Sequence, residues 1–333
     1  MIKTGKTRVI QYGLGPIGCQ MARHVLERSG LELVGAVDID PAKAGRDVGD
    51  VIGLGAPTGV VVRRKLEQVL SERGADVVLH ATNSYFDLFK SQIVEILEAG
   101  LDIVSTSEEL SFPWLAHSGP ALEIDKAAKK AGKTVLGTGV NPGFLMDTLP
   151  LGLTGICQRV DHIEVRREQN ASKRRGPFQA KIGSGLTVEQ FNAKMAEGRM
   201  GHVGLPESVG MIFHTLGRKL VRYEDGVEPV VAERTVRTEH FDVPAGRVIG
   251  LRQTARGYTG DREFVKLLFV AALDYECDQD SVFISGKPDL RVTLQGTHGD
   301  IATIAIAVNA VRRVHEAAPG LVTMRDLPIV TTW

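Results

Sequence analysis

Cysteine is scarce in this sequence. Cys19, Cys157 and Cys277 are the three cysteines among 333 residues, and they stand far apart. Their odd number and wide spacing argue against a disulfide framework and against a zinc site, whose ligands usually come in close pairs. We therefore expect three small buried thiols and no bound metal.

An excess of charge of one sign is also missing. Lys plus Arg and Asp plus Glu both number 40, so the formal net charge is +0. Without a general positive field, the chain is not expected to bind nucleic acid or the surface of an anionic membrane. The partners that we expect are small molecules.

Long apolar runs are absent as well. The longest, near Leu267–Leu273, is far too short to span a bilayer. The first residues, MIKTGKTRVIQYG, lack the apolar segment of a secretory signal peptide. The composition is otherwise that of an ordinary globular protein, with 43% hydrophobic and 24% charged residues. We expect a cytoplasmic protein with about two domains.

A glycine-rich turn near the start of the chain is the clearest feature that is present. Val9 and Ile10 lead into the segment GLGPIG, and a helical pattern follows at once. In such a turn the first glycine allows a tight bend, the second admits a pyrophosphate, and the third lets the helix pack on the strand. The phosphates would lie on the free N–H groups of the helix start, where proline is tolerated. The pattern predicts a dinucleotide site, although glycines that only serve packing are the alternative; its residues would be Gly13, Gly15, Pro16, Ile17 and Gly18.

An acidic residue follows the next predicted strand. Leu31–Val37 reads as this strand, and Asp38 comes 20 residues after Gly18, where an acid can bind a ribose hydroxyl. Lys43 and Arg46 follow within reach of the same ribose. An acid disfavours the 2′-phosphate of NADPH, whereas nearby cations favour it, so the choice between NADH and NADPH stays open.

Strands and helices alternate up to about residue 150. Strands are expected at 60–62, 76–81, 102–105 and 134–136, and helices at 66–71, 86–99 and 120–131. This alternation predicts a Rossmann domain, a doubly wound parallel sheet with right-handed crossovers. Ligands bind beyond the carboxyl ends of such strands, so Thr82, Asn83 and Asn141 are predicted beside the cofactor.

The pattern changes in the second half of the chain. Strands are expected at 159–169, 248–255, 263–273, 281–285 and 290–295, with helices near 188–198 and 208–220. This predicts an α+β domain over 151–299, built on a mostly antiparallel sheet, for substrate binding and dimerisation. A final helix, capped by Asp300, should pack back on the first domain, which then comprises 1–150 and 300–333.

Two neighbouring glutamates are candidates for catalysis. Glu108 and Glu109 follow the strand at 102–105, on the edge of the sheet where the cofactor is expected. A nicotinamide enzyme usually needs one acid or base beside the ring to move protons. Paired acids at a helix start also serve simply as partners of the helix dipole. The residues alone leave both interpretations open.

Candidates for the substrate pocket are more scattered. The Asn141-Pro142-Gly143 triplet is either only a turn or the place where the Asn141 amide holds the nicotinamide carboxamide. Phe144 and Leu145 would then form an apolar wall. Further side chains of the predicted pocket alternate on one strand face or precede the last helix; they are Arg167, Gln169 and His298, the last with a structural histidine as its alternative.

Several segments together resemble a known family. They are RVIQYGLGPIG, STSEEL, GTGVNPGFLMD and GDIATIAIAVNAVRRVHEAAPGLVTMRDLP. They are similar to the 2,4-diaminopentanoate dehydrogenase family and the related NAD(P)H-dependent amine dehydrogenases, whose fold is shared with dihydrodipicolinate reductase. The resemblance extends over essentially the whole chain. The basic substrate motif of dihydrodipicolinate reductase is absent.

The resemblance implies a reaction and a catalytic residue. The reaction is the reversible reductive amination of a ketone or aldehyde with ammonia, with NAD(P)H as cofactor, and its reverse is the oxidative deamination of an amine or diamino acid. Glu108 would be the acid/base and Asn141 the nicotinamide-side asparagine, in a homodimer. Three alternatives stay open: 2,4-diaminopentanoate dehydrogenase itself, an imine reductase of the dihydrodipicolinate reductase type, and a regulatory protein that senses NAD(P).

Overall fold

The computed structural model describes residues 5–198 and 200–333. The chain divides into two compact units. The first comprises the described residues up to Phe144 together with His298–Trp333, and the second comprises Leu145–Thr297. The cofactor and substrate roles expected for the two halves of the chain stay predictions.

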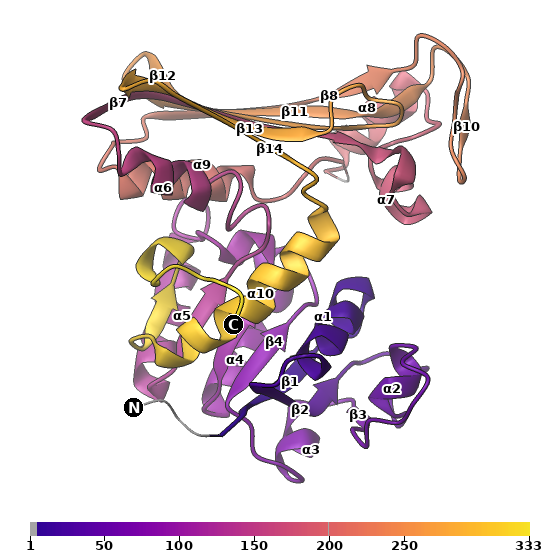
Figure 1. Cartoon of the computed structure of the whole chain (residues 1–333), viewed down its shortest axis with the longest axis vertical. Coiled ribbons are helices and arrows are strands. Elements are labelled where there is room, and N and C mark those ends of the chain that lie inside the picture. Colours follow the sequence, from indigo (N-terminus) through magenta and orange to yellow (C-terminus); the bar gives the residue numbers. More distant parts are fainter. Residues whose placement is uncertain (1–4, 199) are drawn as a thin grey trace. The chain divides into compact units, whose positions relative to one another are not determined.

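A seven-stranded sheet forms the centre of the first unit (Figure 1). Its strands are, in spatial order, β15 (Gly320–Val322), β6 (Thr134–Gly137), β5 (Asp102–Ser105), β4 (Val77–His80), β1 (Thr7–Tyr12), β2 (Leu31–Val37) and β3 (Val62–Arg63). All neighbouring strands pair in parallel. The strand order reverses beside β1, which is where open α/β sheets bind their ligands. The predicted doubly wound parallel sheet is confirmed.

Helices cover both faces of this sheet. They are α1 (Pro16–Leu26), α2 (Val48–Val51), α3 (Leu66–Leu70), α4 (Phe86–Glu98), α5 (Ser118–Ala131) and α10 (Gly299–Glu316). Met21 of α1 and Val311 of α10 belong to one apolar cluster, whereas Phe89 of α4 and Ile124 of α5 belong to another. Each of these side chains is fully buried, which contributes about 1.5–3 kcal/mol per large apolar side chain.

The second unit is built on a six-stranded sheet. Its order is β14 (Leu290–Gln295), β13 (Gln279–Lys287), β7 (Arg159–Asn170), β12 (Arg262–Ala272), β11 (Val248–Thr259) and β8 (Arg222–Val231). β7 and β12 pair in parallel, and the other neighbours pair in antiparallel fashion. The predicted mostly antiparallel sheet is therefore confirmed, and β8 is an addition to it.

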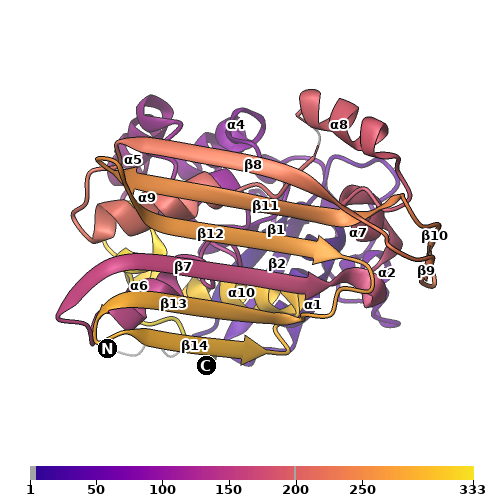
Figure 2. The same ribbon diagram turned by 90° about the horizontal axis from the view of Figure 1, so that it is seen from above.

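The helices of the second unit leave one face of its sheet uncovered. These helices are α6 (Thr148–Thr154), α7 (Gly176–Lys181), α8 (Val188–Ala196) and α9 (Leu205–Thr215). The unit also contains a hairpin of β9 (Val236–Arg237) and β10 (Asp242–Val243). Figure 2 looks onto the uncovered face of this sheet, where all six strands are in open view.

Two helix ends differ from the prediction. α9 ends at Thr215 and not near 220, because Gly217 takes a left-handed conformation with φ of 62° and the Arg218 N–H bonds back to the Phe213 carbonyl. The cap of α10 is His298, whose Nδ1 accepts the Ile301 N–H at 3.4 Å. Asp300 lies within the first turn instead, where its charge favours the helix dipole.

An ion pair between β1 and the residue before β4 should make the stability of the protein depend on pH. Arg8 donates to Asp76 at 3.1 Å from Nε and at 2.8 Å from Nη2, and this bonding lowers the pKa of Asp76 to about 2 from 3.8. A lowered carboxyl pKa gives stability that is complete above the ordinary pKa and is lost as pH falls through the folded value. We expect Asp76→Asn to lower Tm at neutral pH, and the difference from wild type to shrink below pH 3.8. Circular dichroism melts measure it, and equal Tm values at neutral pH would contradict it.

Candidate functional site

The turn between β1 and α1 has the shape that a bound pyrophosphate needs. Gly13 has φ of 87°, and a Cβ there would lie 2.3 Å from the Ala81 carbonyl oxygen. A Cβ on Gly18 would lie 1.9 Å from the Gly13 carbonyl oxygen, so α1 can begin this close to the turn only with glycine. A Cβ on Gly15 would meet no described atom within 4 Å. The turn therefore packs tightly against the protein at Gly13 and Gly18 and leaves free space at Gly15.

The first turn of α1 lies directly beyond this opening. Gly15 is the N-cap and Pro16 the first helical residue, and the first turn carries no acidic side chain. The N–H groups of Ile17 and Gly18 have no earlier carbonyl within the helix to bond, and the helix dipole makes this end positive. The glycine turn and the helix start thus fit a diphosphate, as the sequence predicts.

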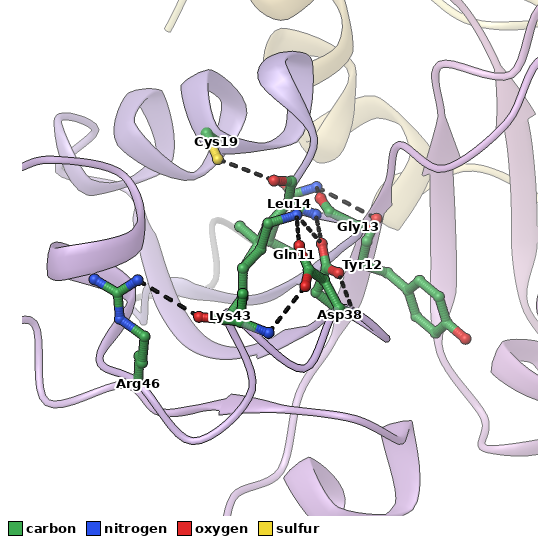
Figure 3. Close-up of polar contacts among 10 residues, drawn as sticks. Gln11, Tyr12, Gly13, Leu14, Cys19, Asp38, Lys43 and Arg46 are labelled. Carbon is green, nitrogen blue, oxygen red and sulfur yellow. Dashed lines mark hydrogen bonds and ion pairs between the residues drawn. The ribbon is translucent and has the colours of Figure 1, made fainter.

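Asp38 lies beside the glycine turn, at the end of β2 (Figure 3). Its Oδ2 accepts the Leu14 N–H at 2.7 Å and lies 3.2 Å from Lys43 Nζ, while Oδ1 accepts the Asp40 N–H at 2.9 Å. Lys43 Nζ is also 3.3 Å from Asp40. Burial opposes the charge of Lys43, but its bonds to Asp38 and Asp40 raise its pKa above the usual value. The structure therefore joins Asp38 and Lys43 at the turn, whereas Arg46 is exposed.

Thr82 and Asn83 follow β4, on the other side of β1. Thr82 Oγ1 donates to Gln92 Oε1 at 2.7 Å, and its methyl would lie 3.0 Å from a Cβ on Gly13. Asn83 Oδ1 accepts the Tyr85 N–H at 3.0 Å, which forms a local turn before α4. Thr82 thus reaches the glycine turn, while the Asn83 side chain supports its own loop.

Glu109 is part of the fold. Its Oε2 accepts the Phe86 N–H at 2.5 Å, at the start of α4, and lies 3.3 Å from His117 Nε2. The His117 ring stacks on Phe86 with ring centroids 4.7 Å apart. A carboxylate at a helix start stabilises the helix through the unpaired N–H groups and the dipole. The dipole interpretation of the sequence therefore applies to Glu109.

Glu108 begins the short 3-10 turn Glu108–Leu110 that follows β5. The preceding Ser107 N–H donates to Ser105 Oγ at 3.1 Å. The Glu108 carbonyl accepts the Ser111 N–H at 3.1 Å and the Ser111 hydroxyl at 2.8 Å. The backbone of this half-buried glutamate is thus held on both sides, at the edge of the sheet where the glycine turn lies.

Asn141 lies in the turn that follows β6, the neighbour of β5. The turn is tied to the rest of the unit because the Thr138 N–H donates to the Ser105 carbonyl at 2.8 Å and the Val140 N–H donates to Thr303 Oγ1 at 3.2 Å. Asn141 is buried, with 7% of its surface exposed. The structure therefore brings Glu108 and Asn141 to adjacent strand ends.

The other predicted pocket residues have varied surroundings. Arg167 Nη1 lies 3.1 and 3.2 Å from the two carboxylate oxygens of Asp280, and the side chains are 3% and 6% exposed. Burial lowers the pKa of Arg167 and raises that of Asp280. Gln169 and Leu145 are buried, Phe144 is half-buried, and the exposed His298 caps α10. Contact of these residues with a substrate stays a prediction.

His80 is a polar residue of this region that sequence reasoning missed. It ends β4, is fully buried, and bonds through both ring nitrogens, at 2.8 Å to Ser105 Oγ and at 2.8 Å to Gln92 Oε1. Burial lowers its pKa to about 4. The one signal for it in the sequence was a histidine that ends an apolar strand.

The described residues also bear on metals, membranes and thiols. Within 5–198 and 200–333, no three His, Cys, Asp or Glu side chains are grouped so that they could hold a metal ion. No helix in the described part of the chain combines the length and apolar character needed to cross a bilayer. Cys19, Cys157 and Cys277 are free thiols, but they are half-buried rather than buried as expected. Cys19 packs against the apolar cluster that contains Met21.

Comparison with known proteins extends this picture. The family model for the 2,4-diaminopentanoate dehydrogenase C-terminal domain matches residues 144–333, and the model for the dihydrodipicolinate reductase N-terminus matches residues 7–106. The 2,4-diaminopentanoate dehydrogenase of Acetoanaerobium sticklandii is 35% identical over 97% of this chain and 94% of its own length. An amine dehydrogenase of Streptomyces virginiae is 24% identical over 96% of both chains.

A solved structure agrees with these matches. The amine dehydrogenase from Mycobacterium smegmatis superposes with a TM-score of 0.87 at 25% identity, over 99% of this chain and 98% of that chain. The predicted resemblance, the predicted fold class and the predicted enzyme class, an oxidoreductase related to amine dehydrogenases, are confirmed. The chain belongs to the 2,4-diaminopentanoate dehydrogenase family.

Proposed function

We propose that this protein catalyses the reversible reductive amination of a ketone or aldehyde with ammonia. The observation that carries the proposal is a carboxylic acid, Glu108, in a rigidly held turn at the same sheet edge as the glycine turn. Membership of a family of amine-oxidising dehydrogenases supports the reaction class. In the reverse direction the same groups would deaminate an amine or a diamino acid.

The residues around the glycine turn fit a nicotinamide dinucleotide. The diphosphate would lie on the backbone at Gly15 and on the start of α1, and Asp38 would hold the adenosine ribose. Thr82, Asn83 and Asn141 would hold the nicotinamide side, since they follow β4 and β6, the two strands that flank β5 in the parallel sheet. When bound, the cofactor supplies or accepts the hydride.

Glu108 would manage the protons of the reaction. As ammonia adds to the carbonyl carbon, the carboxylate takes a proton from the nitrogen and passes it to the oxygen, which gives a neutral carbinolamine. A second proton, which the carboxyl group takes from ammonium or water and gives to the hydroxyl, lets the oxygen leave as water while the nitrogen forms an iminium ion. The resulting iminium carbon is cationic, and a nearby carboxylate stabilises it until hydride transfer makes the amine. A single carboxylate can perform both tasks because they follow one another.

Substrate charge is the finer part of the proposal. Phe144, Leu145, Arg167, Gln169 and His298 stay the substrate contacts that the sequence predicts. Arg167 already has Asp280 as its partner, so a substrate carboxylate would have to compete with a buried ion pair. This favours ketones and aldehydes without a carboxylate over a diamino acid.

The Asp38 and Lys43 pair would allow both NADH and NADPH to bind. Asp38 favours the ribose hydroxyls of NADH, and Lys43, at 3.2 Å from it, can turn to a 2′-phosphate. We expect Lys43→Ala to weaken NADPH binding about tenfold or more, with little change for NADH, since it removes a cation that only a phosphate needs. Fluorescence titration measures both affinities. Lys65→Ala, which breaks the exposed pair of Lys65 with Glu67, is the matched control; equal losses for both cofactors would contradict the assignment.

We further propose a cytoplasmic homodimer that forms through the uncovered face of the second unit's sheet (Figure 2). Arg166 and Arg291 both lie over the Phe283 ring there, each 5.1 Å from its centroid. Glu164 pairs with Arg166 and Lys266 on the neighbouring positions. Such a mixed apolar and charged surface suits a self-complementary contact. Sedimentation should give twice the chain mass of 36.0 kDa, and a monomer would contradict the proposal.

The test of the function is an oxidation assay for NADH and NADPH. Ketones and aldehydes, with and without a carboxylate, are supplied in the presence and absence of ammonium. We expect oxidation only when a carbonyl compound and ammonium are both present. Oxidation that needs no ammonium would point to an imine or carbonyl reductase instead, and cofactor binding without oxidation of any pair would point to a sensor.

A further inference from the structure

His80 joins three elements of the first unit through hydrogen bonds. It ends β4, while its bonding partners Ser105 and Gln92 belong to β5 and α4. Thr82 Oγ1 also lies 3.0 Å from His80 Nε2. His80 and Ser105 are both fully buried. A buried polar network of this kind holds its members rigidly when all of its bonds are made.

The direction of these bonds follows from what each atom can donate. Gln92 Oε1 only accepts, so the hydrogen of the His80 ring lies on Nε2. Nδ1 then has a lone pair and accepts the hydroxyl hydrogen of Ser105. The Ser105 oxygen is thereby turned so that a lone pair accepts the Ser107 N–H at 3.1 Å. Burial, which lowers the pKa of His80 to about 4, keeps the ring neutral at ordinary pH.

The network ends on the residue next to Glu108. Ser107 is the N-cap of the 3-10 turn, and its N–H is fixed by Ser105. On the other side Ser111 holds the Glu108 carbonyl. The Ser107 carbonyl also accepts the Leu110 N–H at 3.1 Å within the turn. The neutral His80 ring therefore adds, through Ser105, a second anchor on the side of the turn that precedes Glu108. A displacement of about 1 Å in a catalytic group can cost about 100-fold in rate.

We propose that His80, acting through the Ser105 hydroxyl, is a positioning residue that fixes Glu108 for proton transfer. The inference rests on the proposed function, because it takes Glu108 as the acid/base. His80 touches neither substrate nor cofactor in this role; it sets the orientation of a hydroxyl whose oxygen anchors the Glu108 turn. A histidine that only fills the core would predict no special dependence on Glu108.

Ser105→Ala is the main test, because it removes the one hydroxyl that joins His80 to the Glu108 turn. We expect kcat to fall by about 100-fold while the NADH Kd stays near that of wild type. Tm should also fall, because the buried His80 Nδ1 and the Ser107 N–H lose their partner. In a Glu108→Gln background, Ser105→Ala should cause no further loss, since the group that it positions is already gone. Wild-type kcat in Ser105→Ala, or an equal loss in both backgrounds, would overturn the proposal.

A second pair of variants covers the case in which Ser105→Ala does not fold. Gln92 is half-buried, so its replacement disturbs the core less. Gln92→Met removes the acceptor for the His80 ring and should lower kcat, but it should cause no further loss in a Glu108→Gln background. Equal losses in the two backgrounds would also overturn the proposal. Absence of ammonium-dependent oxidation by the wild-type enzyme would refute the proposed function instead, so the two failures are distinguishable.

Discussion

Glu108→Gln should lower kcat by about 1,000-fold while leaving NADH affinity nearly unchanged, because general acid–base catalysis contributes about 100- to 10,000-fold. The amide has nearly the size of the carboxylate, but it can neither take a proton from ammonia nor stabilise an iminium cation. The glycine turn and Asp38 lie at other strand ends, so cofactor binding does not depend on this side chain. Steady-state rates and a fluorescence titration measure the two quantities.

The adjacent residue offers a matched control. Glu109→Gln makes the same chemical change one position later, where the carboxylate accepts the Phe86 N–H and pairs with His117. We expect it to lower the free energy of unfolding by about 1–2 kcal/mol and to keep most of the wild-type kcat. Wild-type turnover in Glu108→Gln would remove that residue from the chemistry. A large loss of kcat in Glu109→Gln at unchanged stability would assign the catalytic role to Glu109 instead of Glu108.

Two alanine substitutions in the glycine turn should have distinct effects. Gly18→Ala places a methyl group 1.9 Å from the Gly13 carbonyl oxygen, so the turn must open, and we expect both a lower Tm and the loss of NADH binding. Gly15→Ala meets no described atom within 4 Å, and its extended backbone, with φ of −67° and ψ of −177°, suits any residue. We expect it to keep the wild-type Tm and to weaken NADH binding about tenfold or more, since the methyl group occupies the approach to the pyrophosphate.

Thermal melts and titrations with NADH separate these outcomes. The contrast is informative because the two residues are three positions apart in the same turn, yet one supports the fold and the other leaves room for a ligand. A Gly15→Ala protein that binds NADH as tightly as wild type would show that the diphosphate does not pass this point. Loss of Tm in Gly15→Ala would show that the position is not open.

Local pattern was enough to predict the local structure around the glycine turn, whose residues stay predicted contacts of a cofactor. The glycine turn, the start of α1 and Asp38 follow one another along the chain, and each depends on residue type and spacing within a short segment. The parallel sheet followed from the alternation of apolar strands with amphipathic helices. The strand β8 was missed because Gly226 and Pro229 interrupt its pattern; an edge strand tolerates proline, since one of its sides has no neighbouring strand.

Long-range contacts explain what could not be predicted. Glu108 and Glu109 look alike in the sequence, and only the bond from the Phe86 N–H, 23 residues away, gives Glu109 its structural role. Arg167 reads as a surface or pocket cation until Asp280, 113 residues later, pairs with it on the adjacent strand. The burial of His80 depends likewise on β5 and α4 closing around the end of β4. Residue spacing carries no information about these partners.

The most direct test of the central claim is the isotopic content of the product. The enzyme is given a simple ketone, isotopically labelled ammonium, and NADH or NADPH with deuterium at the transferable position. The proposed reaction predicts an amine that carries the labelled nitrogen and one deuterium on the same carbon. An alcohol that carries deuterium and no nitrogen would contradict reductive amination.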